Sequence, residues 1–289
     1  MRSSNPVMRN LGSDFNRNQS AGAYQQGFQN QFDSYGAQAG QDRGYGQPAF
    51  GGRQGSERPM TVDDVVTKTG ITLGVIVLFA LINFGLSLVN PGLTLILTGV
   101  GGIGGFITVL VHSFGKKFGS AAVTLIYAAF EGLFVGGISL VFAGMFSSQG
   151  IDADAGAAII GQAVLGTIGV FIGMLFVYKT GAIKVTPKFQ RIVTGAIVGV
   201  AVLALGNLLL ALFTGMNPLR DGGMLAIIFS LVCIVLSALS FLQDFDLADE
   251  LVRAQAPQQM AWGVALGLAV TLVWLYTEIL RLLSYFNRN

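Results

Sequence analysis

Charged residues are scarce in this chain. Only 11% of its 289 residues are Asp, Glu, Lys or Arg, whereas 52% are hydrophobic, and the mean hydropathy is +0.64. A soluble domain carries about a quarter charged residues, so a soluble globule is excluded and lipid is the expected solvent. The net charge is +2 and no basic run is present, which argues against a nucleic-acid partner.

Cysteine and histidine are almost absent. Cys233 is the one cysteine and lies in an apolar run, so it cannot form an intramolecular disulfide and is interpreted as a small core residue. His112 is the one histidine, and a histidine-based zinc site or a Ser-His-Asp triad would have to rest on it alone. No nucleophile motif surrounds His112, so it is interpreted as an interfacial residue. We expect neither an enzyme nor a bound cofactor.

Seven apolar runs of membrane-spanning length follow residue 60. Each has the roughly 20 residues that a helix needs to cross the hydrocarbon core, and Thr61 with Asp64 forms an N-cap signature before the first run. The sequence therefore predicts an all-α integral membrane protein with a seven-transmembrane-helix domain at residues 60–289. The runs lie near residues 70–89, 94–113, 120–146, 157–178, 192–213, 223–242 and 260–285.

Residues 1–59 have a different composition. Gly, Gln, Asn and Tyr dominate this segment, and no periodic apolar face is present. Such a segment cannot bury enough apolar surface to offset the entropy lost on ordering. The composition predicts a disordered cytoplasmic tail that acts as a flexible tether.

Basic residues in the short loops predict the orientation, because Lys and Arg favour the cytoplasmic side. They precede the first run and lie between the second and third runs and between the fourth and fifth runs. The opposite loops carry only Arg220. We expect a multi-pass protein of the cell membrane with a cytoplasmic N-terminus and an external C-terminus.

Glycines recur at four-residue spacing within the runs, which allows helix backbones to approach closely in lipid. A dinucleotide-binding fingerprint is also matched by letters, from Gly99 to Gly104. We reject it, because its glycines lie inside one continuous apolar run and no acidic residue follows at the required distance. The glycine pairs are Gly101 and Gly105, Gly132 and Gly136, Gly169 and Gly173, Gly195 and Gly199, and Gly263 and Gly267.

Three acidic residues lie within or at the end of predicted spans, where an ionisable side chain is costly and marks a functional site. Glu131 lies in the third run, Asp246 at the end of the sixth and Glu278 in the seventh. For Glu278 the alternative is an ion pair with Arg281 at the outer interface, where Trp274, Tyr276 and Tyr285 would form an aromatic belt. Three nearby acids are interpreted as solvated residues of a cytoplasmic loop: Asp244, Asp249 and Glu250.

The end of the chain carries a resemblance to a known family. The sixth run ends in Phe-Leu-Gln-Asp-Phe-Asp, and the last run contains Leu-Tyr-Thr-Glu-Ile-Leu-Arg-Leu-Leu. Together with the seven spans, these motifs resemble the Bax inhibitor-1/YccA family, in an actinobacterial-looking branch, over residues 60–286. The resemblance implies six helices around a central seventh. It also implies a pH-sensitive calcium leak that is gated by a carboxylate pair, Asp246 and Glu278.

Such a pair has a clear physical rationale. Two carboxylates in a low-dielectric site cannot both ionise easily, so they share a proton. Deprotonation would supply repulsion that opens a gate and oxygen ligands for transient Ca²⁺ binding by Asp246 and Glu278. On untilted helices, however, Asp246 would lie about 15 Å and Glu278 about 30 Å from a turn near Pro257. Glu131, at an intermediate depth, is therefore a competing partner for Glu278.

Three functions are compatible with these features. The first is a pH-sensitive cation leak channel with Ca²⁺ as the permeant ion. The second is a non-conducting membrane interaction protein that modulates a membrane protease or a stress response, as the YccA part of the family implies. The third is a secondary transporter, because glycine-broken helices with buried acids also fit that class. All three place the chain in a lipid bilayer and leave its oligomeric state open.

Overall fold

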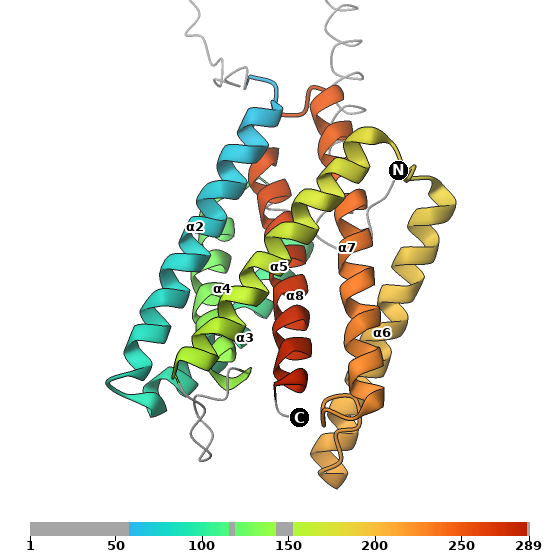
Figure 1. Ribbon diagram of the computed structural model, residues 1–289. Helices are drawn as coiled ribbons and strands as arrows, with labels where there is room; N and C mark the ends of the chain where they lie inside the picture. The colour runs from blue at the N-terminus through green and yellow to red at the C-terminus, as the bar shows by residue number, and fades with distance from the viewer. Residues whose placement is uncertain (1–57, 116–118, 143–152, 288–289) are drawn as a thin grey trace, which may run out of the picture.

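The computed structural model describes residues 58–115, 119–142 and 153–287, and these residues form seven α-helices and no sheet (Figure 1). All seven are long and apolar enough to cross a membrane. The predicted all-α membrane fold is confirmed, whereas the predicted tail falls almost entirely outside the described residues. The helices are α2 (Val62–Ser87), α3 (Pro91–Phe114), α4 (Ala121–Phe142), α5 (Ala153–Thr180), α6 (Pro187–Thr214), α7 (Met224–Arg253) and α8 (Met260–Phe286).

Side-chain caps set several helix ends. Thr61 accepts a hydrogen bond from the Asp64 amide and Asp64 accepts one from the Thr61 amide, which completes the predicted capping box. Asn90 and Thr186 cap α3 and α6, each before a proline in the first turn. At its other end, α6 stops at Gly215, whose φ of 73° favours glycine.

The last helix is the centre of the bundle. In its most apolar window 78% of the residues are buried, compared with 6% in α6. α8 packs against α2, α4, α5 and α7, and it is drawn in red among these helices in Figure 1. α3 packs on α4 and α2, while α6 packs on α7. The predicted central position of the seventh helix is confirmed, with its main contacts made by four helices.

Glycines allow α2, α3 and α4 to pack closely. A Cβ atom added to Gly132 would lie 2.5 Å from the carbonyl oxygen of Ile76 on α2. One added to Gly101 would lie 2.6 Å from the carbonyl oxygen of Phe130 on α4. Both distances are far below van der Waals contact, so only glycine fits. The predicted close approach is confirmed for the glycine pairs of α3 and α4, and the rejected fingerprint lies inside the continuous helix α3.

The glycine pairs of α5 and α6 behave differently. A Cβ atom added to Gly169, Gly173, Gly195 or Gly199 would meet nothing within 4 Å. These faces point away from the other helices, so the prediction of close helix contact is wrong for both pairs. Four-residue spacing places two glycines on one face, but it carries no information about what that face meets.

The sixth span is longer than predicted. α7 continues to Arg253, whereas the predicted sixth run ends near residue 242 and is followed by acids interpreted as loop residues. Leu247 and Leu251, four residues apart, are buried along the extension. Their spacing keeps an apolar face toward the bundle, so packing sustains the helix although polar residues alternate with the leucines.

The chain that leads into α2 is bonded to the turn between α7 and α8. The Met60 amide donates to the Ala256 carbonyl at 2.7 Å, and the Gln258 amide donates to the Arg58 carbonyl at 3.1 Å. Asp64 accepts hydrogen bonds from the side chains of Arg58 at 2.7 Å and Gln258 at 3.0 Å. Residues 58 and 59, assigned above to the tail, therefore contact the bundle.

We call the end of the bundle that carries the α7–α8 turn the inner end, and the opposite end the outer end. The α3–α4 connection lies at the inner end as well, because a Cβ atom added to Gly119 would be 2.9 Å from the Cβ atom of Gln259. The α6–α7 loop and the last residues of α8 lie at the outer end (Figure 1). That the inner end faces the cytoplasm stays a prediction.

Candidate functional site

A buried carboxylate joins α7 to α8 in the core of the bundle. Asp244 on α7 is 0% exposed, and its Oδ2 atom accepts a hydrogen bond of 2.7 Å from the hydroxyl of Thr271 on α8. The same hydroxyl lies 3.3 Å from the carbonyl oxygen of Gly267, to which it can also donate. The interpretation of Asp244 as a solvated loop residue is therefore wrong. The helix continues past residue 242, and this turns Asp244 toward α8.

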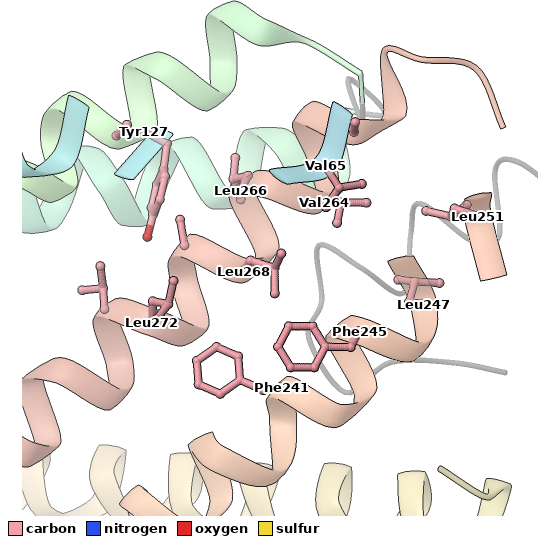
Figure 2. Close-up of a cluster of buried hydrophobic side chains, with 14 of the residues drawn as sticks. Val65, Tyr127, Phe241, Phe245, Leu247, Leu251, Val264, Leu266, Leu268 and Leu272 are labelled. Carbon is pink, nitrogen blue, oxygen red and sulfur yellow. The ribbon is translucent and has the colours of Figure 1, made fainter. Parts of the chain in front are cut away.

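Aromatic side chains flank Asp244 along α7. Phe241 and Phe245, on either side of Asp244 along α7, each make an edge-on contact with Phe171 of α5, with ring centroids 5.4 and 5.5 Å apart. Figure 2 shows the two rings between α7 and α8, near Leu268 and Leu272. From the facing helix, the Thr271 hydroxyl is a polar group that bonds to this carboxylate.

The register of the helices gives the depth of the acids. Thr271 is the twelfth of the 27 residues of α8, so Asp244 lies near the middle of the bundle. α4 runs parallel to α8, and the offset between them is 138 residues at the Thr124–Trp262 hydrogen bond and 137 at the Ser139–Tyr276 hydrogen bond. Glu131 on α4 is therefore level with residue 268 or 269 of α8. Asp244 and Glu131 lie at nearly the same depth.

Glu131 points toward α3. A Cβ atom added to Gly105 would lie 2.8 Å from the Oε2 atom of Glu131, so this glycine makes room for the carboxylate. Tyr127, one turn earlier on α4, is 2% exposed and lies beside Glu131. The predicted span residue is thus a partly buried acid that points toward a neighbouring helix, and its predicted role in an ion pathway stays a prediction.

The structure does not bring Asp246 and Glu278 together. Asp246 is half-buried on α7, and the charges nearest to it are those of Glu250 and Asp249. Asp246 lies two residues closer to the inner end than Asp244, and Glu278 lies seven residues closer to the outer end than Thr271. Nine residues correspond to about 14 Å along a helix. The roles of Asp246 and Glu278 as gate and as transient Ca²⁺ ligands stay predictions.

Glu278 instead pairs with Arg281, as the alternative interpretation has it. The Nη1 atom of Arg281 lies 2.8 Å from both carboxylate oxygens. Both side chains are buried, with 8% of the arginine and 7% of the glutamate exposed. Tyr276 and Tyr285 are buried as well. The pair therefore lies inside the protein, and the interpretation of these tyrosines as an aromatic belt is wrong.

A family model described as Bax inhibitor 1 like matches residues 5–288. The chain belongs to the Bax inhibitor 1 like family. The match extends almost to the N-terminus, beyond the residues 60–286 that carry the resemblance noted above. A search of curated proteins found no match.

In this Bax inhibitor 1 like chain the acids do not assemble into a resident metal site. No group of three or more His, Cys, Asp or Glu side chains suited to a metal ion occurs among the residues that the structure describes. A cation that entered the bundle would meet carboxylates one at a time, with hydroxyls and carbonyls as further oxygen ligands. Weak binding by few ligands suits an ion that must also leave.

A lateral crevice with a volume of about 450 Å³ opens between α2, α4, α5 and α8. Its walls are almost wholly apolar, and Ser139 and Tyr276 line it with hydroxyls that bond to each other at 2.7 Å. The acids Asp244, Glu131 and Glu278 do not line it. Hydrocarbon suits such walls better than a hydrated ion, so this crevice is not a route for cations.

Asp244 is the site residue that the sequence analysis missed. The signal that identifies it is helical periodicity beyond residue 242: Phe241, Leu247 and Leu251 are buried and lie three or seven residues from Asp244. An acid on that face points into the bundle. The helical spacing of these apolar residues predicts a helix here, although the segment contains many polar residues.

Proposed function

We propose that this Bax inhibitor 1 like protein is a pH-sensitive cation leak channel with Ca²⁺ as the permeant ion. Asp244 carries the proposal, because it is fully buried at mid-depth and bonded to Thr271 of the central helix. Ionisable residues inside membrane spans are costly, and they mark ion or proton pathways. The resemblance to a family with a calcium leak channel supports the choice of ion.

The chemistry of a buried carboxylate links cation passage to pH. Burial disfavours the ionised form of a carboxylate, and either a proton or a cation can balance its charge. A proton on Asp244 leaves one fewer oxygen for a cation, whereas the deprotonated group offers the hard oxygen ligands that Ca²⁺ prefers. Since a proton and Ca²⁺ compete for the same carboxylate, the leak rises as pH rises.

Other acids extend this pathway along the bundle. Glu131 lies at nearly the same depth as Asp244, and Glu278 lies about 10 Å farther toward the outer end, at seven residues of rise. In this proposal Asp244 is the central acid, and Glu278 is the outer acid whose charge Arg281 balances at 2.8 Å. Asp246 remains the alternative central acid that the family resemblance implies.

The test is Ca²⁺ flux into liposomes that contain the purified full-length protein, measured between about pH 5 and 8, where a coupled carboxylate can titrate. The wild type is expected to leak faster at the higher pH. Asp244→Asn should remove this pH dependence, whereas Asp246→Asn, a matched change two residues away on the same helix, should keep most of it. The reverse result for the two variants would assign the role to Asp246.

Two results would overturn the proposal as a whole. A wild-type protein that gives no flux above empty liposomes does not conduct. A flux that requires a gradient of a second ion or solute identifies the secondary transporter instead. Both outcomes are measured on the same liposomes, so an absence of flux can be distinguished from a flux that needs a second gradient.

A second function, that of a non-conducting membrane interaction protein, is supported by α6. This helix packs mainly on α7, and only 6% of its apolar window is buried. Leu205 and Leu208 are 58% and 61% exposed, so a long apolar face is free to meet a partner helix as well as lipid. Two results together would establish this function. A photo-crosslinker at Leu208 captures one specific membrane protein, and liposomes that contain the purified protein show no Ca²⁺ flux.

A further inference from the structure

Three polar atoms at the outer end of the α7–α8 interface are buried without a hydrogen-bond partner. They are the Nε atom of Arg281 and the hydroxyls of Tyr285 and Ser230. The three residues are 7%, 4% and 0% exposed. A buried donor without a partner destabilises the folded state, so three such groups in one region need a common explanation.

The helix register brings these atoms to one level. Counting fourteen residues toward the outer end from the contact between Asp244 and Thr271 leads to Ser230 on α7 and Tyr285 on α8. Fourteen residues are close to four turns of about 3.6 residues, so both side chains return to the facing sides of the two helices. Arg281 lies one turn before Tyr285 on the same face.

Two guanidinium groups and two carboxylates lie in this region. Arg281 shares its Nη1 atom between the two oxygens of Glu278. Arg220, from the α6–α7 loop, lies near Arg281 and Glu278. No carboxylate among the described residues forms an ion pair with Arg220. Desolvation and then the charge of Arg281 lower the pKa of Arg220. The Asp221 carboxylate accepts a hydrogen bond from the Gly223 amide at 2.9 Å and lies near Tyr285.

The guanidinium of Arg281 is accessible only along its edge. The ring of Phe142 covers one face, with its centroid 5.4 Å from the Cζ atom of Arg281. The Nη1 atom is occupied by Glu278, which leaves the edge that carries Nε. A ligand on that edge has to be compact, and it has to accept hydrogen bonds, because all three unpartnered groups can donate.

We propose that the outer end of the α7–α8 interface is a binding site for a small inorganic anion of the size of chloride. The anion accepts hydrogen bonds from Arg281 Nε and from the hydroxyls of Tyr285 and Ser230, and Arg220 closes the site from the loop. The site goes beyond the proposed cation leak and does not depend on it.

The test uses full-length protein in detergent, exchanged into sodium gluconate and titrated with sodium chloride at constant ionic strength. Chloride should raise the melting temperature with a saturable dependence, because a ligand that binds only the folded state stabilises it. Gluconate is too large for the edge of Arg281 and should have no such effect. Broadening of the ³⁵Cl resonance by the protein gives a second, direct measurement of binding.

Two tyrosine variants separate binding from stability. Tyr285→Phe removes an unpartnered hydroxyl, so the variant should be at least as stable as wild type in gluconate, while chloride binding weakens about tenfold or more. Tyr276→Phe is the matched control, because its hydroxyl bonds to Ser139 at 2.7 Å. It should lower the melting temperature in both salts and leave the chloride response intact. A wild type without a chloride-specific response, or Tyr285→Phe with the full response, would overturn the proposal.

Discussion

The packing of α2 against α4 gives a sharp prediction about a single methyl group. In Gly132→Ala, the new Cβ atom would lie 2.5 Å from the carbonyl oxygen of Ile76 and 2.7 Å from the Cβ atom of Phe79. Neither obstacle is the flexible end of a side chain, since one is backbone and the other is the first atom of a side chain. The two helices must therefore separate.

The size of the effect follows from these distances. Carbon atoms in contact lie about 3.5 Å apart, so the helices have to separate locally by about 1 Å. Overpacking of this kind costs about 1–3 kcal/mol. At about 3 °C per kcal/mol for a domain of this size, a central cost of about 2 kcal/mol lowers the melting temperature by about 6 °C.

Thermal unfolding of the detergent-solubilised protein measures this change. Gly199→Ala on α6 is the matched control, because its Cβ atom would meet nothing within 4 Å. Alanine is the better helix former by about 1 kcal/mol, so this variant should match or exceed the wild type. A Gly132→Ala protein that melts at the wild-type temperature would refute the close contact between α2 and α4.

Three further predictions concern the ends of the bundle. In intact cells and a cysteine-free background, a membrane-impermeant thiol reagent should label Asp152→Cys but not Thr186→Cys; labelling of the latter would reverse the predicted orientation. Deletion of residues 1–55 should leave the melting temperature nearly unchanged, because the segment has no apolar face to dock, and a large fall would show that it packs on the bundle. Asp64→Ala should destabilise by about 1–2 kcal/mol through loss of its buried hydrogen bonds. The exposed neighbour Asp63→Ala should not, and equal melting temperatures would count against the inner-end contact.

The sequence predicts the fold well because lipid reduces the choice of structure. A backbone in hydrocarbon must satisfy its own hydrogen bonds, so each apolar run of sufficient length becomes a helix. The capping box at Thr61 identifies the first helix start by local chemistry. The end of α7 could not be placed in this way, because helix–helix packing and not lipid sustains its last residues.

The candidate site was harder to predict, because it depends on the direction in which an acid points. Asp244 and Asp246 differ by two positions, about 200° of rotation around a helix. One is fully buried against α8 and the other is half-buried beside Asp249 and Glu250. A motif that contains both acids identifies the region, and only the facing helix distinguishes them. The same limit applies to the glycine pairs, where spacing gives the face and not its neighbour.

The polar contacts of α8 indicate where a change at Asp244 would act. α8 is bonded to α4 at two levels, through the carbonyl of Trp262 and the hydroxyl of Tyr276. Its bond to α7 at mid-depth runs through Thr271 to the carboxylate of Asp244. A proton or a cation that takes up an oxygen of Asp244 competes with this hydrogen bond, whereas the bonds to α4 involve no ionisable group near neutral pH. In the proposed leak, pH therefore acts on the contact between α7 and α8, while α4 and α8 stay joined as the fixed wall of the pathway.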